Sequence, residues 1–198
     1  MTRLVRDEGG YSLIELLTVM AILSIVLGGI STLFVQGSNA EAEMNVRFQA
    51  QTQARLAIDK MRRELHSACS VAAGWTSSSA TFNMVNTAAN PQACDGTVKI
   101  TWCAQGSANR WGLYRVSGAS CSGGVKFADY LVNATTPNTA PAIFSDYRSP
   151  TATGVTGNPN AHNLGSIVVA LPVNVKPTRA LDLYLLQGAI VLRNSGRL

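Results

Sequence analysis

The sequence is poor in charged side chains and in the residues that usually carry catalysis. Asp, Glu, Lys and Arg make up only 14% of its 198 residues, against roughly 25% in typical soluble proteins. It has two histidines, His66 and His162, and neither has a His, Cys or acid at metal-ligand spacing. There is no Gly-x-Ser-x-Gly sequence, phosphate-binding glycine loop or paired-acid motif. We therefore expect no catalytic residue, metal site, cofactor or small-molecule substrate, and a protein that is not an enzyme.

The positive net charge of +5 does not by itself indicate nucleic-acid binding. Its densest basic cluster is Lys60, Arg62 and Arg63, which Asp59 and Glu64 flank. Mixed charges of this kind are typical of a solvated helix face. Nucleic acid as a partner is possible but unsupported, because a DNA-binding head would need a contiguous basic patch.

The cysteines indicate an oxidising compartment. Cys69, Cys94, Cys103 and Cys121 all follow the hydrophobic segment described below, and no Cys-x-x-Cys pair suggests zinc. Gly, Ser, Thr and Asn are abundant in the same part of the chain. An even number of cysteines in a loop-rich exported domain predicts two disulfides, with three possible connectivities.

One uninterrupted apolar segment dominates the N-terminal region. Residues Leu16–Val35 are almost wholly apolar, and no charged residue occurs from Leu16 to Ala40. Twenty helical residues span about 30 Å, the thickness of the bilayer core, so the segment predicts a membrane span. A conventional signal peptide cut after Ser38-Asn39-Ala40 is the alternative. Its apolar core would be unusually long, and it would have no reason to carry Glu15.

The orientation rests on the size of the domain that follows. Arg3 and Arg6 before the span are balanced by Arg47 and Arg55 after it, so the positive-inside rule gives no answer. Domains longer than about 60 residues cross largely regardless of such charges. The cysteines favour an oxidising side for that domain, so we place the N-terminus in the cytoplasm and the head outside, in a single-pass protein of the inner membrane.

The residues around the start of the span resemble the type IV prepilin signal. Gly9–Leu17 reads GGYSLIELL after a short charged leader. The family pattern has a glycine before the cleaved bond, an aromatic residue after it and a glutamate at the fifth mature position, followed by a hydrophobic helix. These places are taken here by Gly10, Tyr11, Glu15 and Leu16 onward.

Tyr11 and Ser12 are small departures from the family pattern, because phenylalanine and threonine are commoner at these places. The hydrophobic helix lacks the proline of many major pilins, and in this it resembles a minor pilin or J-type pseudopilin more than a major pilin. Residues 111–115 and 190–194 are similar, more diffusely, to large minor pilins and J-type pseudopilins.

The resemblance implies a processing and assembly route. A prepilin peptidase would cut between Gly10 and Tyr11 and methylate the new amine of Tyr11. Glu15 would pair with that amine on a neighbouring subunit; the alternative is a glutamate that merely snorkels at the membrane boundary. The implied partners are other pilin or pseudopilin subunits, the peptidase, the lipid bilayer and the filament assembly machinery.

The function predicted from this resemblance is a structural subunit of a type IV pilus or a type II secretion-like filament. The alternatives are a stand-alone membrane-anchored binding protein and a DNA-uptake pilin, and N-terminal processing separates the first of these from a filament subunit. The sequence does not distinguish among the filament systems.

The predicted fold class is α+β and pilin-like, with a long N-terminal helix packed on an antiparallel β-rich head. The predicted divisions are a cleaved leader (1–10), a transmembrane and assembly helix (11–40), an amphipathic stalk helix (41–69) and an extracytoplasmic head (70–198). The stalk pattern places on one packing face Met44, Phe48, Gln51, Ala54, Ile58, Met61, Leu65 and Ala68.

The head is predicted to consist of short strands separated by Gly, Asn, Pro and Ser. The expected strands are 80–85, 97–104, 111–117, 126–132, 166–175 and 179–193, with hairpins around 106–109 and 176–179 and an exposed loop over 133–163. A first hairpin centred between Ser107 and Ala108 would set Cys94 against Cys121 and leave Cys69 for Cys103. The other two connectivities stay open.

Overall fold

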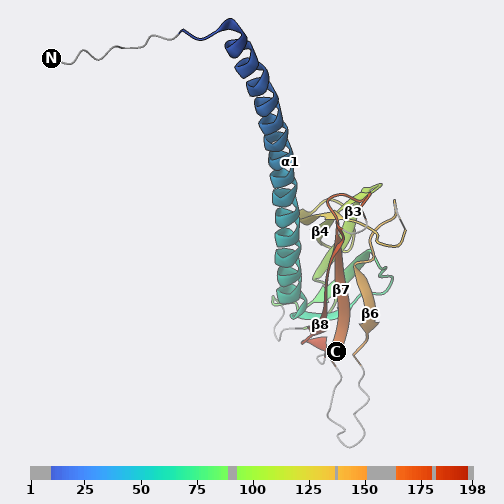
Figure 1. Ribbon diagram of the computed structural model, residues 1–198. Coiled ribbons are helices and arrows are strands. Elements are labelled where there is room, and N and C mark those ends of the chain that lie inside the picture. The colour runs from blue at the N-terminus through green and yellow to red at the C-terminus, as the bar shows by residue number, and fades with distance from the viewer. Residues whose placement is uncertain (1–9, 89–92, 137, 151–163, 180–181, 196–198) are drawn as a thin grey trace, which may run out of the picture. The chain divides into compact units, whose positions relative to one another are not determined.

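The computed structural model describes residues 10–88, 93–136, 138–150, 164–179 and 182–195 (Figure 1). The chain divides into two compact units, Met1–Asn45 and Val46–Leu198. Residues 1–9 of the predicted leader lie outside the described residues, as do His162 and part of the predicted loop 133–163.

Helix α1, Leu13–Leu65, begins in the first unit and ends in the second. It starts directly after Ser12, whose carbonyl oxygen accepts hydrogen bonds from the backbone N–H groups of Glu15 and Leu16 at 3.1 and 3.2 Å. No proline occurs between Leu13 and Leu65, and Gly28 and Gly29 do not interrupt the helix, although each costs about 1 kcal/mol relative to alanine. Every residue from 10 to 42 is exposed, on all sides of the helix, as expected for a helix whose solvent is lipid.

The second unit consists of the C-terminal part of α1 and an antiparallel sheet (Figure 1). Its order in the described chain is β1-β2-β3-β4-β5-β7-β6, and β8 pairs with β7 on the other side. The order of β1 to β5 in the sheet is therefore their order in the chain, and β6 and β8 both pair with β7. The strands are β1 Ala68–Val71, β2 Ser79–Met84, β3 Lys99–Ser107, β4 Arg110–Ser117, β5 Val125–Leu131, β6 Phe144–Arg148, β7 Gly165–Val173 and β8 Tyr184–Leu192. The α+β prediction is confirmed.

The helix contributes a narrow, alanine-rich face to the core. Its buried residues are Ala50, Ala54, Ala57, Ile58, Met61 and Leu65. The prediction was wrong at the beginning of this face, because Met44 and Phe48 are each 70% exposed. Alanine side chains allow close approach of the helix backbone to the sheet, and this contact begins only at Ala50. The prediction was also wrong at the end, because the helix stops at Leu65 and Ala68 is buried in strand β1.

Three polar links fasten the same part of the helix to the sheet. The Arg47 guanidinium donates to both carboxylate oxygens of Asp182, at 3.0 and 2.7 Å. Arg115 on β4 donates to Glu64 at 2.9 Å, and Arg55 donates to the Tyr184 hydroxyl at 3.1 Å. A bidentate arginine–carboxylate pair fixes direction as well as distance, so the Arg47 link adds to the orientation that the buried face of the helix already has.

Both predicted hairpins are present, but the predicted strands needed three corrections. Strand β1 was not predicted, and β6 lies inside the stretch 133–163 that was predicted to be loop. Strand β8 begins at Tyr184 instead of residue 179. β6 is held by tertiary contacts, because Phe144 is 1% exposed and its N–H donates to the Ser77 carbonyl oxygen at 2.8 Å.

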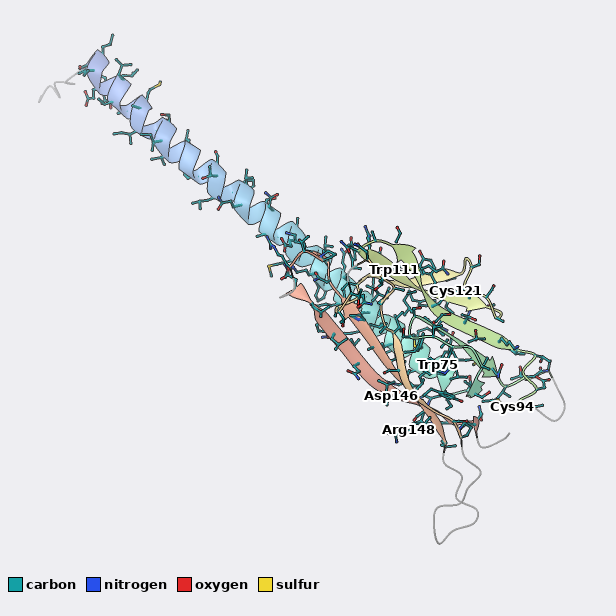
Figure 2. The ribbon with its side chains drawn as sticks, turned by 90° about the vertical axis from the view of Figure 1, so that its right-hand side faces the viewer. Trp75, Cys94, Trp111, Cys121, Asp146 and Arg148 are labelled. Atoms are coloured by element: carbon teal, nitrogen blue, oxygen red, sulfur yellow. A yellow bond between two sulfur atoms is a disulfide. The ribbon has the colours of Figure 1, made fainter. Side chains whose placement is uncertain are left out.

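Two disulfides are present as predicted, but the favoured connectivity was wrong. The bridges join Cys69 to Cys94 and Cys103 to Cys121. The β3–β4 turn is centred one residue later than predicted, with Ser107 opposite Arg110, and the pairing stops at Ile100 and Ser117. Cys94 and Cys121 therefore lie outside this ladder, on different loops, and Figure 2 shows them well apart.

Candidate processing and assembly site

The predicted cleavage bond lies in exposed, non-helical backbone. Gly10, Tyr11 and Ser12 precede the first turn of α1. A Cβ atom added at Gly10 would meet no heavy atom within 4 Å, and Tyr11 is 84% exposed. Exposed backbone without hydrogen-bonded structure is the form in which proteases reach a peptide bond. The geometry is therefore compatible with cleavage between Gly10 and Tyr11.

Glu15 lies in the first turn of α1, four residues after Tyr11. The free N–H groups at a helix N-terminus favour a carboxylate there by about 0.3–1 kcal/mol. The spacing Ser12-x-x-Glu15 also fits a capping box, a local signal that is already present in the sequence. Glu15 thus has a local reason to occur at this position, and an assembly role must be tested separately from it.

The hydroxyl groups in the apolar part of the helix are exposed, but each has a hydrogen-bond partner within the helix itself. The hydroxyl oxygens of Thr18, Ser24, Ser31 and Thr32 lie 2.8–2.9 Å from carbonyl oxygens three or four residues earlier in the helix. These four are all the hydroxyl groups between Leu13 and Val35. An unsatisfied hydroxyl in hydrocarbon would cost several kcal/mol. By length and composition the helix can cross a membrane, and its hydrogen bonding meets the same requirement.

The β4–β5 region contains an ion cluster around Asp129. Arg110 donates to Asp129 at 2.8 Å and Lys126 donates at 3.1 Å, while the Tyr130 N–H donates at 2.8 Å. Burial raises the pKa of Asp129, but these hydrogen bonds outweigh burial and hold the pKa at about 2. The Arg110 guanidinium also lies 4.2 Å from the centre of the Tyr130 ring. The cluster thus surrounds Tyr130, whose φ is 60°.

Several basic side chains of the head are paired with acids, which weakens the case for a nucleic-acid surface. The basic–acidic pairs are Arg47–Asp182, Lys60–Glu64, Arg62–Asp59, Arg110–Asp129, Arg115–Glu64 and Lys126–Asp129.

Within the described ranges, no group of three or more His, Cys, Asp and Glu side chains is arranged to hold a metal. His66 follows the helix, and its Nδ1 lies 3.0 Å from the Val191 carbonyl oxygen.

Comparison with known proteins identifies the N-terminal segment. Residues 5–31 match the family model described as the prokaryotic N-terminal methylation motif. Neither curated proteins nor solved structures give a significant match to the chain. The matched residues include Gly10, Tyr11 and Glu15 and most of the apolar run. The chain therefore carries a type IV pilin-like prepilin signal, joined to a helix that can anchor it in a membrane.

Proposed function

We propose that the chain is a non-catalytic structural subunit of a type IV pilus or a type II secretion-like filament, of the minor pilin or pseudopilin kind. The observation that carries the proposal is the methylation motif at residues 5–31, which extends into the apolar part of α1. A stand-alone anchored protein needs the helix but not the motif. A filament subunit uses both.

The proposed route has three steps. The chain inserts with its N-terminus in the cytoplasm and its disulfide-bonded head outside. A prepilin peptidase then cleaves after Gly10 and methylates the Tyr11 amine. Finally α1 leaves the lipid and packs against the helices of other subunits. The exposed apolar surface between Leu13 and Val35 supports this last step, because it is uncharged after Glu15 and its hydroxyl groups need no outside partner.

In this proposal Glu15 pairs with the Tyr11 amine of the adjacent subunit. A carboxylate in an apolar helix costs about 2.5–3.5 kcal/mol at mid-bilayer and less near the interface. Removing that charge should therefore help membrane insertion. It should harm assembly, because a buried ion pair that loses one partner leaves the other charge uncompensated.

Two measurements test the proposal. Intact-mass analysis of the native protein should give a mature chain that begins at N-methylated Tyr11. A chain that begins at Glu41 would indicate a conventional signal peptide and would end the pilin interpretation. An unprocessed chain in the membrane would favour the stand-alone binding protein.

The second measurement compares Glu15→Val with wild type for membrane content, N-terminal processing and sheared-filament content. Glu41→Val is the matched control, because Glu41 is an exposed acid on the same helix beyond the apolar run. We expect Glu15→Val to insert and to be cleaved, yet to enter filaments poorly, while Glu41→Val assembles normally. Equal filament content in wild type and Glu15→Val would refute the assembly role of Glu15.

A further inference from the structure

The second unit has a hollow where three turns of the head meet. Its volume is about 400 Å³, within the range of small-ligand sites. Its walls come from the β3–β4 turn, the segment after β5 and the β7–β8 turn. A neighbouring hollow of about 260 Å³ shares part of this wall. The lining residues that matter below are Ala108, Asn109, Asn133, Asn138, Asn174 and Thr178.

Two asparagines hold the walls of the hollow in place. Asn133 accepts hydrogen bonds from the N–H groups of Thr135 and Thr136, both at 2.9 Å, and donates to the Ala140 carbonyl oxygen at 3.0 Å. Asn174 is 4% exposed and spans the β7–β8 turn. It accepts from the Lys176 N–H at 2.8 Å and donates to the Arg179 carbonyl oxygen at 2.9 Å. The hollow is therefore preformed.

Other polar groups in the wall are available to a ligand. The carboxamides of Asn109 and Asn138 and the hydroxyl of Thr178 form no side-chain hydrogen bond with another residue in the described part of the chain. A carboxamide presents a donor and an acceptor side by side. The free groups thus contrast with Asn133 and Asn174, whose hydrogen bonds are used by the protein itself.

Backbone strain gathers around the same place. Of the four described non-glycine residues with positive φ, three line the two hollows: Ala108 at 52°, Tyr130 at 60° and Asn138 at 65°. Such conformations are strained for most non-glycine residues and gather at sites that position a ligand. Asp129 helps to hold Tyr130 in its conformation by accepting a hydrogen bond from the Tyr130 N–H.

The chemistry of the wall favours a neutral ligand rich in hydroxyl groups. None of the ten residues that line the larger hollow is charged, so an ionic ligand would lose hydration without gaining a partner. Val132, Pro177 and Leu183 provide apolar surface beside the free amides. We propose that this hollow binds a neutral saccharide of one or two rings, with Asn109, Asn138 and Thr178 contacting its hydroxyl groups and the apolar side chains covering a ring face. This site is independent of the filament role.

The test measures saccharide binding to the full chain by saturation-transfer NMR. The protein is kept in a zwitterionic detergent, because alkyl glucosides and maltosides would themselves compete. The probes are maltose, lactose and N,N′-diacetylchitobiose, after a neutral-glycan array has been used to rank further disaccharides. We expect saturation transfer to at least one neutral saccharide.

Two variants and a control locate the bound sugar. The double variant Asn109→Ala with Asn138→Gly removes both free amides, and glycine keeps the positive φ of residue 138 accessible. We expect it to lower affinity at least tenfold. Thr178→Trp fills the hollow with the amides intact and should also abolish binding. Gln187→Ala removes an exposed carboxamide on β8, outside this hollow, and should bind as wild type does.

The proposal is overturned if wild type binds no neutral saccharide on the array, or if both hollow variants keep wild-type affinity. It is also overturned if an extended peptide of alternating valine and threonine competes with the sugar and depends on the same residues. That outcome would make the site a peptide groove. Thermal melts of each variant show whether a loss of binding reflects the site or the fold.

Discussion

The packing face of α1 gives the sharpest test of the head structure. The heptad-like pattern places Phe48 and Met61 on one face of the helix, but the structure separates them. Met61 is 0% exposed and lies in the core, whereas Phe48 is 70% exposed. Met61→Ala and Phe48→Ala should therefore have very different effects, although the residue that loses more atoms is Phe48.

The magnitudes follow from burial. Truncating a fully buried methionine to alanine costs about 2–5 kcal/mol, because the lost transfer free energy adds to the cost of the cavity. Truncating an exposed side chain changes stability by about 0.5 kcal/mol or less. A difference of 3 kcal/mol is large beside a total stability of about 5–15 kcal/mol. It corresponds to about 6–12 °C in Tm for a domain of this size.

Guanidinium titration of the full chain in detergent measures both effects. The signal is tryptophan fluorescence, because all three tryptophans lie in the second unit and Trp102 is fully buried, with its ring 5.1 Å from that of Phe127. Leu56→Ala is the matched control, an apolar helix residue that is 62% exposed. A Phe48→Ala loss as large as that of Met61→Ala would refute the observed face and restore the face predicted from the sequence.

Three further predictions concern the head. The pKa of Asp129 is held at about 2 against an ordinary 3.8, so its contribution of up to about 2 kcal/mol is complete above pH 4 and is lost as the pH falls through 2. Denaturant titrations from pH 5 to 2 should show this loss in wild type but not in Asp129→Asn, and parallel curves would contradict it. Non-reduced peptide mapping should recover Cys69 linked to Cys94, and replacing both with alanine should cost about 2–4 kcal/mol; another partner for either cysteine would exclude the observed bridge. Gly124→Ala should destabilise the head by about 1 kcal/mol or more beyond Gly123→Ala, because both have positive φ but only at Gly124 would a Cβ overlap a carbonyl oxygen of β4; equal melting temperatures would disprove this.

The long helix and the hairpins could be predicted because their signals are local. An apolar run of twenty residues needs no knowledge of the rest of the chain, and turn residues such as those at 106–109 mark a hairpin by themselves. Strand β6 gave no such signal. Its five residues, Phe144–Arg148, occur among Asn, Pro, Thr and Gly, and their pairing with β7 depends on residues about twenty positions away.

The disulfide error shows how strongly β register depends on a single residue. Moving the turn from Ser107–Ala108 to Ala108–Asn109 changes every opposed pair in the hairpin. Ladder length also matters, because the strands separate beyond Ile100 and Ser117. Neither property is encoded in the spacing of the cysteines, so the sequence predicted the number of bridges and not their partners.

The candidate sites differ in the same way. Gly10, Tyr11 and Glu15 are close in sequence, so their motif could be recognised directly, although their roles need a peptidase and a second subunit. The saccharide hollow joins residues such as Asn109 and Asn174 that are far apart in the chain. In the sequence they are merely part of a composition that is typical of loops, and only the fold brings them together.

The bridge from Cys69 to Cys94 also determines how the head would respond to traction. Tension along α1 reaches Cys69 just four residues after the helix ends at Leu65. The disulfide then transmits the force directly from Cys69 to Cys94, which are 25 residues apart in the sequence. Without the disulfide, this segment could extend by about 80 Å. A head pulled by its helix should therefore lengthen in single-molecule force measurements by about 80 Å less when oxidised than when reduced, so that the first strands of the sheet are protected from mechanical unravelling.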